Sequence, residues 1–165
     1  HVGGFYEQKN HGFLLDIYRE IKKIESDCRL IMIGDGPLFN QIKNECGNLE
    51  VIFTGNIDNV ADYLNAMDGM LLPSLFEGFP LVSVEWQING LPCILSNSIT
   101  EECRLTNLVN FLSLKDGPKK WAELIIQEAR SNNRKKSADE AYQTLKKSDY
   151  NINKAAKLLE RLYKY

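Results

Sequence analysis

The residues best suited to chemistry are two carboxylates, Glu77 and Glu85, which flank a predicted strand-to-helix turn. The strand should end at Pro73, because proline cannot donate a backbone hydrogen bond to a neighbouring strand. Gly78 should give the turn its backbone freedom, and Pro80 suits the first position of the following helix. Glu77 then precedes a helix N-terminus, where free N–H groups and the helix dipole favour an anion. Two carboxylates at such a junction predict a ligand site.

The rest of the chain predicts the scaffold that positions this junction. Apolar strand-like runs alternate with amphipathic helical segments, and the runs lie near residues 2–5, 29–33, 51–54, 69–72 and 92–95. Continuous apolar strands separated by helices are typical of a parallel sheet covered on both faces. We therefore expect one domain over residues 1–165, a three-layer, doubly wound, Rossmann-like α/β fold with additional helices at its C-terminal end.

Polar turns follow these strands. Because ligands of open α/β sheets bind outside the carboxyl ends of the strands, the turns should converge on one crevice. Two further features lie near them: Asn10 is placed to cap the helix that follows it, and Leu81, Val84 and Ile88 recur at the spacing of a buried helix face beside Glu85.

Composition and motifs exclude several function classes. Lys+Arg 20 against Asp+Glu 22 gives a net charge of −2, which argues against nucleic-acid binding by bulk charge. Gly34-Asp35-Gly36 begins a dinucleotide fingerprint but has Phe39 where the third glycine should stand, and no Gly-Lys-Ser/Thr phosphate loop occurs. The histidines, His1 and His11, complete no nucleophile triad. Four cysteines without a CxxC pair predict no zinc site and favour a reducing, cytoplasmic compartment.

An ordered series of short motifs carries a resemblance to a known family. The motifs are Lys9-Asn10-His11, Gly34-Asp35-Gly36-Pro37, Phe53-Thr54-Gly55, Pro73-Ser74, Glu77-Gly78-Phe79-Pro80 with Glu85, and Gly90-Leu91-Pro92. The series resembles the C-terminal, donor-binding domain of a retaining glycosyltransferase of the GT-B fold, in family 4 (glycosyl transferases group 1). Its most specific part is the E-x7-E motif formed by Glu77 and Glu85.

The resemblance implies roles for individual residues. Glu77 and Lys9 would be the catalytic residues: Glu77 would contact hydroxyls of the donor sugar, and Lys9 would pair with the diphosphate and stabilise charge on the leaving group. Glu85 would hold the ribose. Main-chain N–H groups at the start of the helix would approach the sugar and diphosphate, and a turn after the third strand would receive the base. The donor-binding positions implied in this way are Gly4, Gly34, Gly36, Gly55, Asn56, Ile57, Val60, Gly78, Phe79, Pro80, Leu81 and Val82.

The resemblance also implies the reaction. A UDP- or GDP-sugar would donate its sugar, with retention of configuration, to a saccharide or lipid-linked acceptor in bacterial surface polysaccharide synthesis. No metal or other cofactor is expected. The acceptor would bind to an N-terminal GT-B domain that is absent from this chain, so the isolated domain should be inactive. The full-length enzyme would be cytoplasmic, and peripheral association with the inner face of the membrane is compatible with this role.

One position departs from the family. Gly4 stands where the family usually has an arginine that contacts the diphosphate, so Arg104 or a residue of the other domain would have to compensate. Two alternative functions stay open. One is a GT-B-fold nucleotide-sugar epimerase, and the other, which Gly4 favours, is a degenerate, non-catalytic α/β interaction domain.

The C-terminal part is expected to be helical. The basic run Arg134-Lys135-Lys136 is most simply a solvated helix face. The last helix should turn one apolar stripe inward, consisting of Ile152, Ala155, Ala156, Leu159 and Leu162. In the family the C-terminal segment packs on the N-terminal domain, so Tyr163 and Tyr165 should be partly exposed without it.

Overall fold

Five parallel strands form the centre of the structure, a computed structural model that describes residues 1–148 and 150–163. The strand β1 (Leu30–Ile33) pairs with β2 (Val51–Gly55). On the other side β3 (Met70–Leu72) pairs with β4 (Cys93–Ser96), which pairs with β5 (Val109–Leu112). All three pairings are parallel, as the unbroken apolar runs predict.

The first residues of the chain lie between the two groups of strands. The N–H of Ile33 donates to the carbonyl of His1, and the N–H of Gly3 donates to the carbonyl of Ile33, each at 2.9 Å. On the other side, Nδ1 of His1 lies 2.9 Å from the carbonyl oxygen of Leu71 in β3. The strand expected near residues 2–5 is therefore only one bridge, between Val2 and Ile33. Residues 1–3 nevertheless lie between β1 and β3. The order across the sheet is therefore that of a doubly wound fold: β2, β1, residues 1–3, β3, β4, β5.

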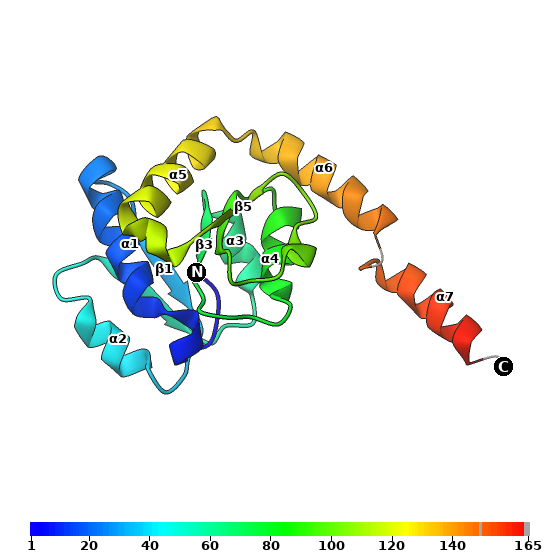
Figure 1. Ribbon diagram of the computed structural model, residues 1–165, viewed down its shortest axis with the longest axis horizontal. Helices are drawn as coiled ribbons and strands as arrows, with labels where there is room; N and C mark the ends of the chain where they lie inside the picture. Colours follow the sequence, from blue (N-terminus) through cyan, green and yellow to red (C-terminus); the bar gives the residue numbers. More distant parts are fainter. Residues whose placement is uncertain (149, 164–165) are drawn as a thin grey trace.

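Alternate residues of the strands supply two hydrophobic clusters, one on each face of the sheet. Leu71 and Ile94 belong to the cluster under α1 (His11–Ile24) and α5 (Gly117–Ser131). Their strand neighbours Leu72 and Leu95 belong to the cluster under the helices on the other side. Three layers result, with α1 and α5 together on one side in Figure 1. The remaining elements of the body are α2 (Phe39–Glu45), α3 (Val60–Asn65), α4 (Leu81–Ile88) and the 3₁₀ turns η1 (Glu7–Lys9), η2 (Glu101–Cys103) and η3 (Leu114–Asp116).

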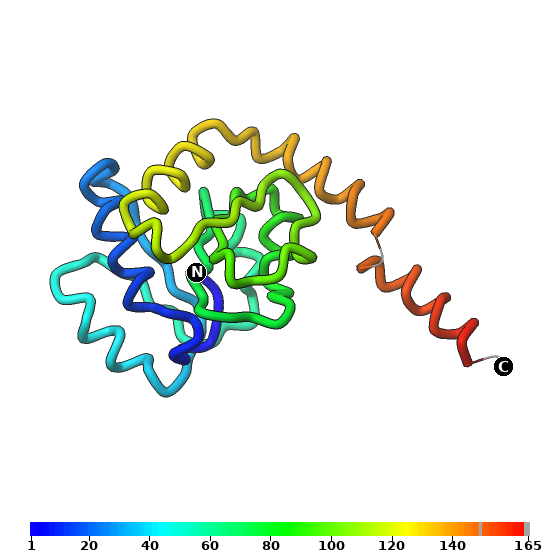
Figure 2. Tube along the Cα trace, viewed as in Figure 1, coloured from blue at the N-terminus to red at the C-terminus, as the bar shows by residue number. Residues whose placement is uncertain are grey.

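Two further helices, α6 (Arg134–Lys147) and α7 (Ile152–Leu162), form an arm that extends away from the sheet (Figures 1 and 2). The arm starts at Arg134, whose guanidinium donates to the carbonyls of Leu64, Asn65, Met67 and Asn89 at 2.6–3.0 Å. Arg134 thus binds the carbonyl ends of α3 and α4, and its interpretation as part of a solvated face is wrong. Lys135 and Lys136 are exposed, as expected.

The inward apolar stripe predicted for α7 is also wrong. None of the residues of α7 is buried, and Ile152 and Leu162 are 76% and 68% exposed. A strongly amphipathic pattern shows that a helix has an apolar face, but it does not show that the covering surface is present. Tyr163 is exposed, as expected, and Tyr165 lies outside the described residues.

Candidate functional site

The centre of the site is an ion pair between Lys9 and Glu77. The Lys9 Nζ donates to Glu77 Oε1 at 2.6 Å, and the side chains are only 13% and 10% exposed. The same carboxylate oxygen accepts a hydrogen bond from Ser74 Oγ at 2.8 Å. The structure therefore brings together the two residues predicted to be catalytic, although they lie far apart in the sequence.

Three contacts hold η1, which carries Lys9, against the end of β3. Besides the ion pair, the N–H of Leu75 donates to the carbonyl of Gln8 at 2.7 Å, and Asn10 Nδ2 donates to the carbonyl of Pro73 at 3.1 Å. Asn10 is at the N-cap position of α1 but makes no side-chain cap, so the predicted capping bond is wrong. Its backbone is left-handed (φ 54°), a conformation that asparagine tolerates better than most residues, and its amide crosses to β3 instead.

Ser74 connects the ion pair to the next strand. This fully buried serine donates to Glu77, and its carbonyl accepts from Ser98 Oγ at 2.9 Å. The Ser98 hydroxyl also lies 2.7 Å from the hydroxyl of Ser96, the last residue of β4. The polar ends of β3 and β4 and the first loop thus form one hydrogen-bonded edge.

The turn into α4 differs from the sequence prediction in two details. Pro80 is the N-cap residue, one position before the helix, rather than its first residue. Gly78 does not have a positive φ, and a Cβ built there meets nothing within 4 Å, so the turn itself does not require a glycine. What Gly78 does provide is an exposed backbone without a side chain next to Glu77. No side chain caps the N-terminus of α4, so its first N–H groups remain available for a ligand.

The buried face of α4 agrees with the predicted one only at Val84. Leu81 is 68% exposed and Ile88 only partly buried, whereas Ser83, Val84, Trp86 and Gln87 are buried. Glu85 lies on the exposed side, on the same helix whose N-terminus adjoins Glu77. Its carboxylate can therefore reach a ligand that lies along the start of α4.

Gln87 is a structural residue that apolar periodicity could not reveal. Its amide Nε2 donates to the carbonyls of Ser83 and Cys103, each at 2.9 Å. Its Oε1 accepts from the N–H groups of Leu105 and Thr106 and from the Thr106 hydroxyl. This buried side chain attaches the loop after η2 to α4.

The paired glycines after β1 permit a close approach between two backbones. A Cβ at Gly34 would lie 2.1 Å from the carbonyl oxygen of Gly3, and one at Gly36 would lie 2.7 Å from the nitrogen of Phe5. The N–H of Gly34 also donates to the carbonyl of Gly55 at the end of β2. These glycines therefore join the first three loops at the carboxyl edge, as the convergence of the turns predicts.

Most of the other predicted donor positions gather around the second hydrophobic cluster. Ile57, Val60, Phe79 and Val82 are partly buried and pack against it. Asn56 is exposed at the turn that follows β2.

The ring of Tyr6 occupies the space beside Gly4. A Cβ at Gly4 would lie 2.7 Å from Tyr6 Cε2, so an arginine there would displace the tyrosine ring. Arg104 does not take over that place, because its guanidinium lies 4.9 Å from the centre of the Phe111 ring on β5. In the order of the strands, β3 and β4 separate β5 from the first residues of the chain.

His11 packs under the site as a buried, neutral ring. It stacks on Phe5 with ring centres 4.3 Å apart, and it meets His1 edge to face. The pKa of His11 is lowered from 6.5 to about 4, mainly by burial, and the positive charge of Lys9 acts in the same direction. These contacts support the interpretation of His11 as a structural residue at the start of α1.

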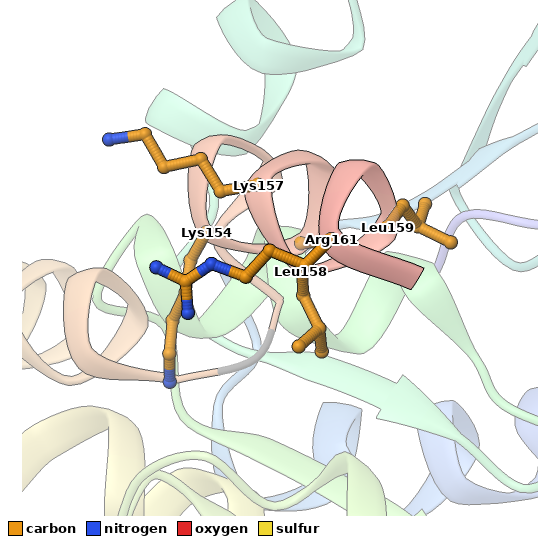
Figure 3. A pocket seen from close by; sticks show the side chains of 6 residues that line it. Lys154, Lys157, Leu158, Leu159 and Arg161 are labelled. Carbon is orange, nitrogen blue, oxygen red and sulfur yellow. The ribbon is translucent and has the colours of Figure 1, made fainter. Parts of the chain in front are cut away.

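A separate hollow lies on the arm. Figure 3 shows this pocket of about 340 Å³, whose lining residues all belong to α7: Lys154, Ala155, Lys157, Leu158, Leu159 and Arg161. None of them belongs to the edge that carries Lys9 and Glu77.

In the described residues, no group of three or more His, Cys, Asp or Glu is placed to hold a metal ion. No helix of residues 1–148 and 150–163 has the length and apolarity that crossing a membrane requires.

The fold and the position of this polar edge define a Rossmann-like domain of the kind found in GT-B glycosyltransferases. The crystal structure of TarM superposes with a TM-score of 0.78 at 17% identity, covering 99% of this chain and 34% of TarM. Anabaena HepE in complex with UDP gives a TM-score of 0.70 at 18% identity, covering 99% of this chain and 48% of HepE. These similarities confirm the predicted fold.

Residues 1–130 match the family described as glycosyl transferases group 1, and the chain belongs to this family. It is 41% identical over 134 residues to the Bacillus subtilis protein EpsF, which is named as a glycosyltransferase. This match covers 78% of this chain and 35% of EpsF. It is 34% identical over 113 residues to the Escherichia coli UDP-Gal:alpha-D-GlcNAc-diphosphoundecaprenol alpha-1,3-galactosyltransferase. This match covers 64% of this chain and 29% of that enzyme. The chain thus spans about a third of the length of these relatives.

Proposed function

We propose that this chain is the nucleotide-sugar-binding domain of a retaining glycosyltransferase that builds a surface polysaccharide. The observation that carries the proposal is the partly buried pair of Lys9 and Glu77 beside the uncapped start of α4. A cation and free backbone N–H groups suit a diphosphate, and a carboxylate beside them suits the hydroxyls of the attached sugar.

Each part of the donor has a matching group. The N–H groups of Phe79, Leu81 and Val82 would face the sugar and diphosphate, and the absence of a side chain at Gly78 leaves room for that approach. Lys9 would neutralise the charge that grows on the diphosphate as the sugar leaves. Glu77, the partner of Lys9, would be free to accept hydrogen bonds from sugar hydroxyls once the diphosphate takes the lysine.

The nucleoside would lie along the outer side of α4. Glu85 is exposed there and would accept hydrogen bonds from the ribose hydroxyls. The turn at Gly55, Asn56 and Ile57 would receive the base through its main chain. We propose a donor of the UDP or GDP type; HepE in complex with UDP and the galactosyltransferase relative, whose name specifies UDP-Gal, favour UDP.

The reaction itself requires a second domain. The relatives are about three times as long as this chain, and we assign the acceptor, a saccharide or lipid-linked sugar, to the part of the longer protein outside residues 1–165. The diphosphate leaving group would help to activate the acceptor for attack on the same face of the sugar, with no metal or other cofactor. A cytoplasmic place, with peripheral membrane contact for a lipid-linked acceptor, fits these substrates.

Titration calorimetry with UDP, UDP-sugars and GDP-sugars tests the proposal. We expect one class of nucleotide sugar to bind, and Glu85→Ala to weaken binding about tenfold through loss of the ribose contact. Glu123→Ala on α5, an exposed acid far along the chain from these motifs, is the matched control and should bind as the wild type does. Equal affinity of the Glu85 and Glu123 variants, or no nucleotide binding by either the chain or its longer protein, would refute the assignment.

A further inference from the structure

The connection between α6 and α7 contacts the turn that precedes α4. The ring of Tyr150 stacks on the ring of Phe79, with centres 5.0 Å apart and planes inclined by 28°. Phe79 follows Gly78 in the sequence, two residues after Glu77, whose carboxylate pairs with Lys9. A residue of the C-terminal arm therefore contacts the turn to which the proposed function assigns the sugar diphosphate.

The body of the domain sets the position of Tyr150. Arg134 binds the arm to α3 and α4, and Gly90 allows α6 to approach so closely that a Cβ there would lie 2.4 Å from the carbonyl oxygen of Arg134. At the other end of α6, Ser148 Oγ accepts from the N–H of Tyr150, and Asn151 Nδ2 donates to the carbonyl of Lys146. These bonds orient the connection while α7 itself has no buried residue.

The turn on the other side of the contact is held mainly at its two ends. Glu77 is bonded to Lys9 and Ser74, and the carbonyl of Pro80 accepts from the Ser83 hydroxyl. Between these ends the turn has fewer contacts. Gly78 is exposed, no side chain caps α4, and Phe76 and Leu81 are among the most exposed apolar residues of the body. Phe79 is only partly buried against the second hydrophobic cluster. The stack with Tyr150 adds a second apolar contact for Phe79.

We propose that Tyr150 is a positioning residue for the turn Glu77–Pro80. By stacking on Phe79 it holds in place the backbone N–H groups that would contact the donor, without touching the donor itself. The inference rests on the proposed function for the identity of the ligand, but the contact between arm and turn is independent of any ligand. Since one aromatic contact is removed, Tyr150→Ala should weaken binding of a nucleotide sugar about three- to tenfold.

Hydrogen exchange of the ligand-free chain over residues 76–82 tests the contact directly. We expect Tyr150→Ala to speed exchange of this segment several-fold, whereas Tyr150→Phe, which keeps the ring, should exchange as the wild type does. Tyr142→Ala is the matched control, because Tyr142 is an exposed tyrosine of α6 whose ring lies by Lys146. In a Phe79→Ala background, Tyr150→Ala should have no further effect. Unchanged exchange in Tyr150→Ala overturns the proposal.

Calorimetry with UDP-glucose, UDP-galactose and GDP-mannose on the same variants separates positioning from mere packing. Weaker binding by Tyr150→Ala that Tyr150→Phe restores supports positioning. Faster exchange with unchanged affinity overturns it, because the stack then serves only stability. If neither the chain nor its longer protein binds any nucleotide while exchange responds to Tyr150→Ala, the proposed function and the positioning role fail but the contact between arm and turn stands.

Discussion

The ion pair between Lys9 and Glu77 makes a quantitative prediction for a double-mutant cycle. Glu77→Gln keeps the shape of the side chain but leaves the Lys9 ammonium without a carboxylate. Lys9→Met keeps most of the apolar stem but leaves Glu77 with only the Ser74 hydroxyl. The double variant removes both charges, so neither charged group is left without its partner. The two single changes should therefore not be additive.

The size of the effect follows from burial. Removing one partner of a fully buried pair costs about 3–5 kcal/mol, whereas an exposed pair contributes at most about 1 kcal/mol. With side chains only 13% and 10% exposed, the Lys9–Glu77 pair lies between these limits, nearer the buried one. We expect each single variant to lose about 2.5 kcal/mol of unfolding free energy, the double variant about 2 kcal/mol, and the coupling energy to be about 3 kcal/mol.

Equilibrium unfolding in urea, followed by the fluorescence of the buried Trp86 and Trp121, measures the cycle. The control is the pair Lys136 and Glu140, whose groups are 3.8 Å apart and 73% and 68% exposed. The cycle with Lys136→Met and Glu140→Gln should give a coupling energy near zero. Additivity within about 0.5 kcal/mol at Lys9 and Glu77 would refute the assignment of a strong, partly buried pair.

The same variants also test the proposed division of labour. If the diphosphate takes Lys9 from Glu77, then Glu77→Gln should bind UDP at least as tightly as the wild type while losing its preference for a UDP-sugar over UDP. Lys9→Met should weaken both ligands about tenfold. An equal loss of UDP affinity in the two variants would show that Lys9 contributes no more to diphosphate binding than Glu77 does.

Three further predictions concern the supports of the site. Gln87→Met should lower the unfolding free energy by roughly 2–4 kcal/mol and speed exchange in the loop after η2, because the partly buried N–H groups of Leu105 and Thr106 lose their acceptor; wild-type exchange there would contradict this. Arg134→Met should lower stability by about 2 kcal/mol in the same urea assay and expose α6 to exchange, whereas the exposed Lys135→Met should change neither. The pKa of His11 is lowered to about 4 in the folded chain, so the unfolded chain binds more protons between pH 6.5 and 4, and stability should fall as the pH drops through this window. In His11→Leu, the urea midpoint should depend less on pH in this window. An unchanged dependence of the midpoint on pH would assign the loss of stability to other groups.

The scaffold could be predicted because its signals are local. Strands buried on both faces must be apolar throughout, so the runs at β1, β3 and β4 are visible in the sequence, as is the junction that leads to Glu77. The order of short motifs was enough to indicate the family. Boundaries were less certain: Pro80 proved to cap α4 rather than begin it, because its ψ of 89° is not helical.

The contacts that build the site could not be predicted in the same way. Nothing local to Lys9 or Glu77 indicates that they pair, since the contact depends on residues 1–3 lying between β1 and β3. The buried face of α4 was misjudged because Gln87, a polar residue, is buried with its hydrogen bonds satisfied while Leu81 is left exposed. Pattern reasoning counts apolar residues and so misses both cases.

The exposed apolar side chains around the site indicate what must still cover it. Tyr6, Leu75, Phe76 and Leu81 are all exposed, and they lie within a few residues of Lys9 or Glu77 along the chain. Single exposed apolar residues are ordinary, but several at the mouth of a polar site are typical of an interface. A sugar and a diphosphate are too polar to cover these side chains. We therefore expect a bound nucleotide sugar to leave them exposed, and the closing wall to come from the longer protein or from an acceptor with an apolar part.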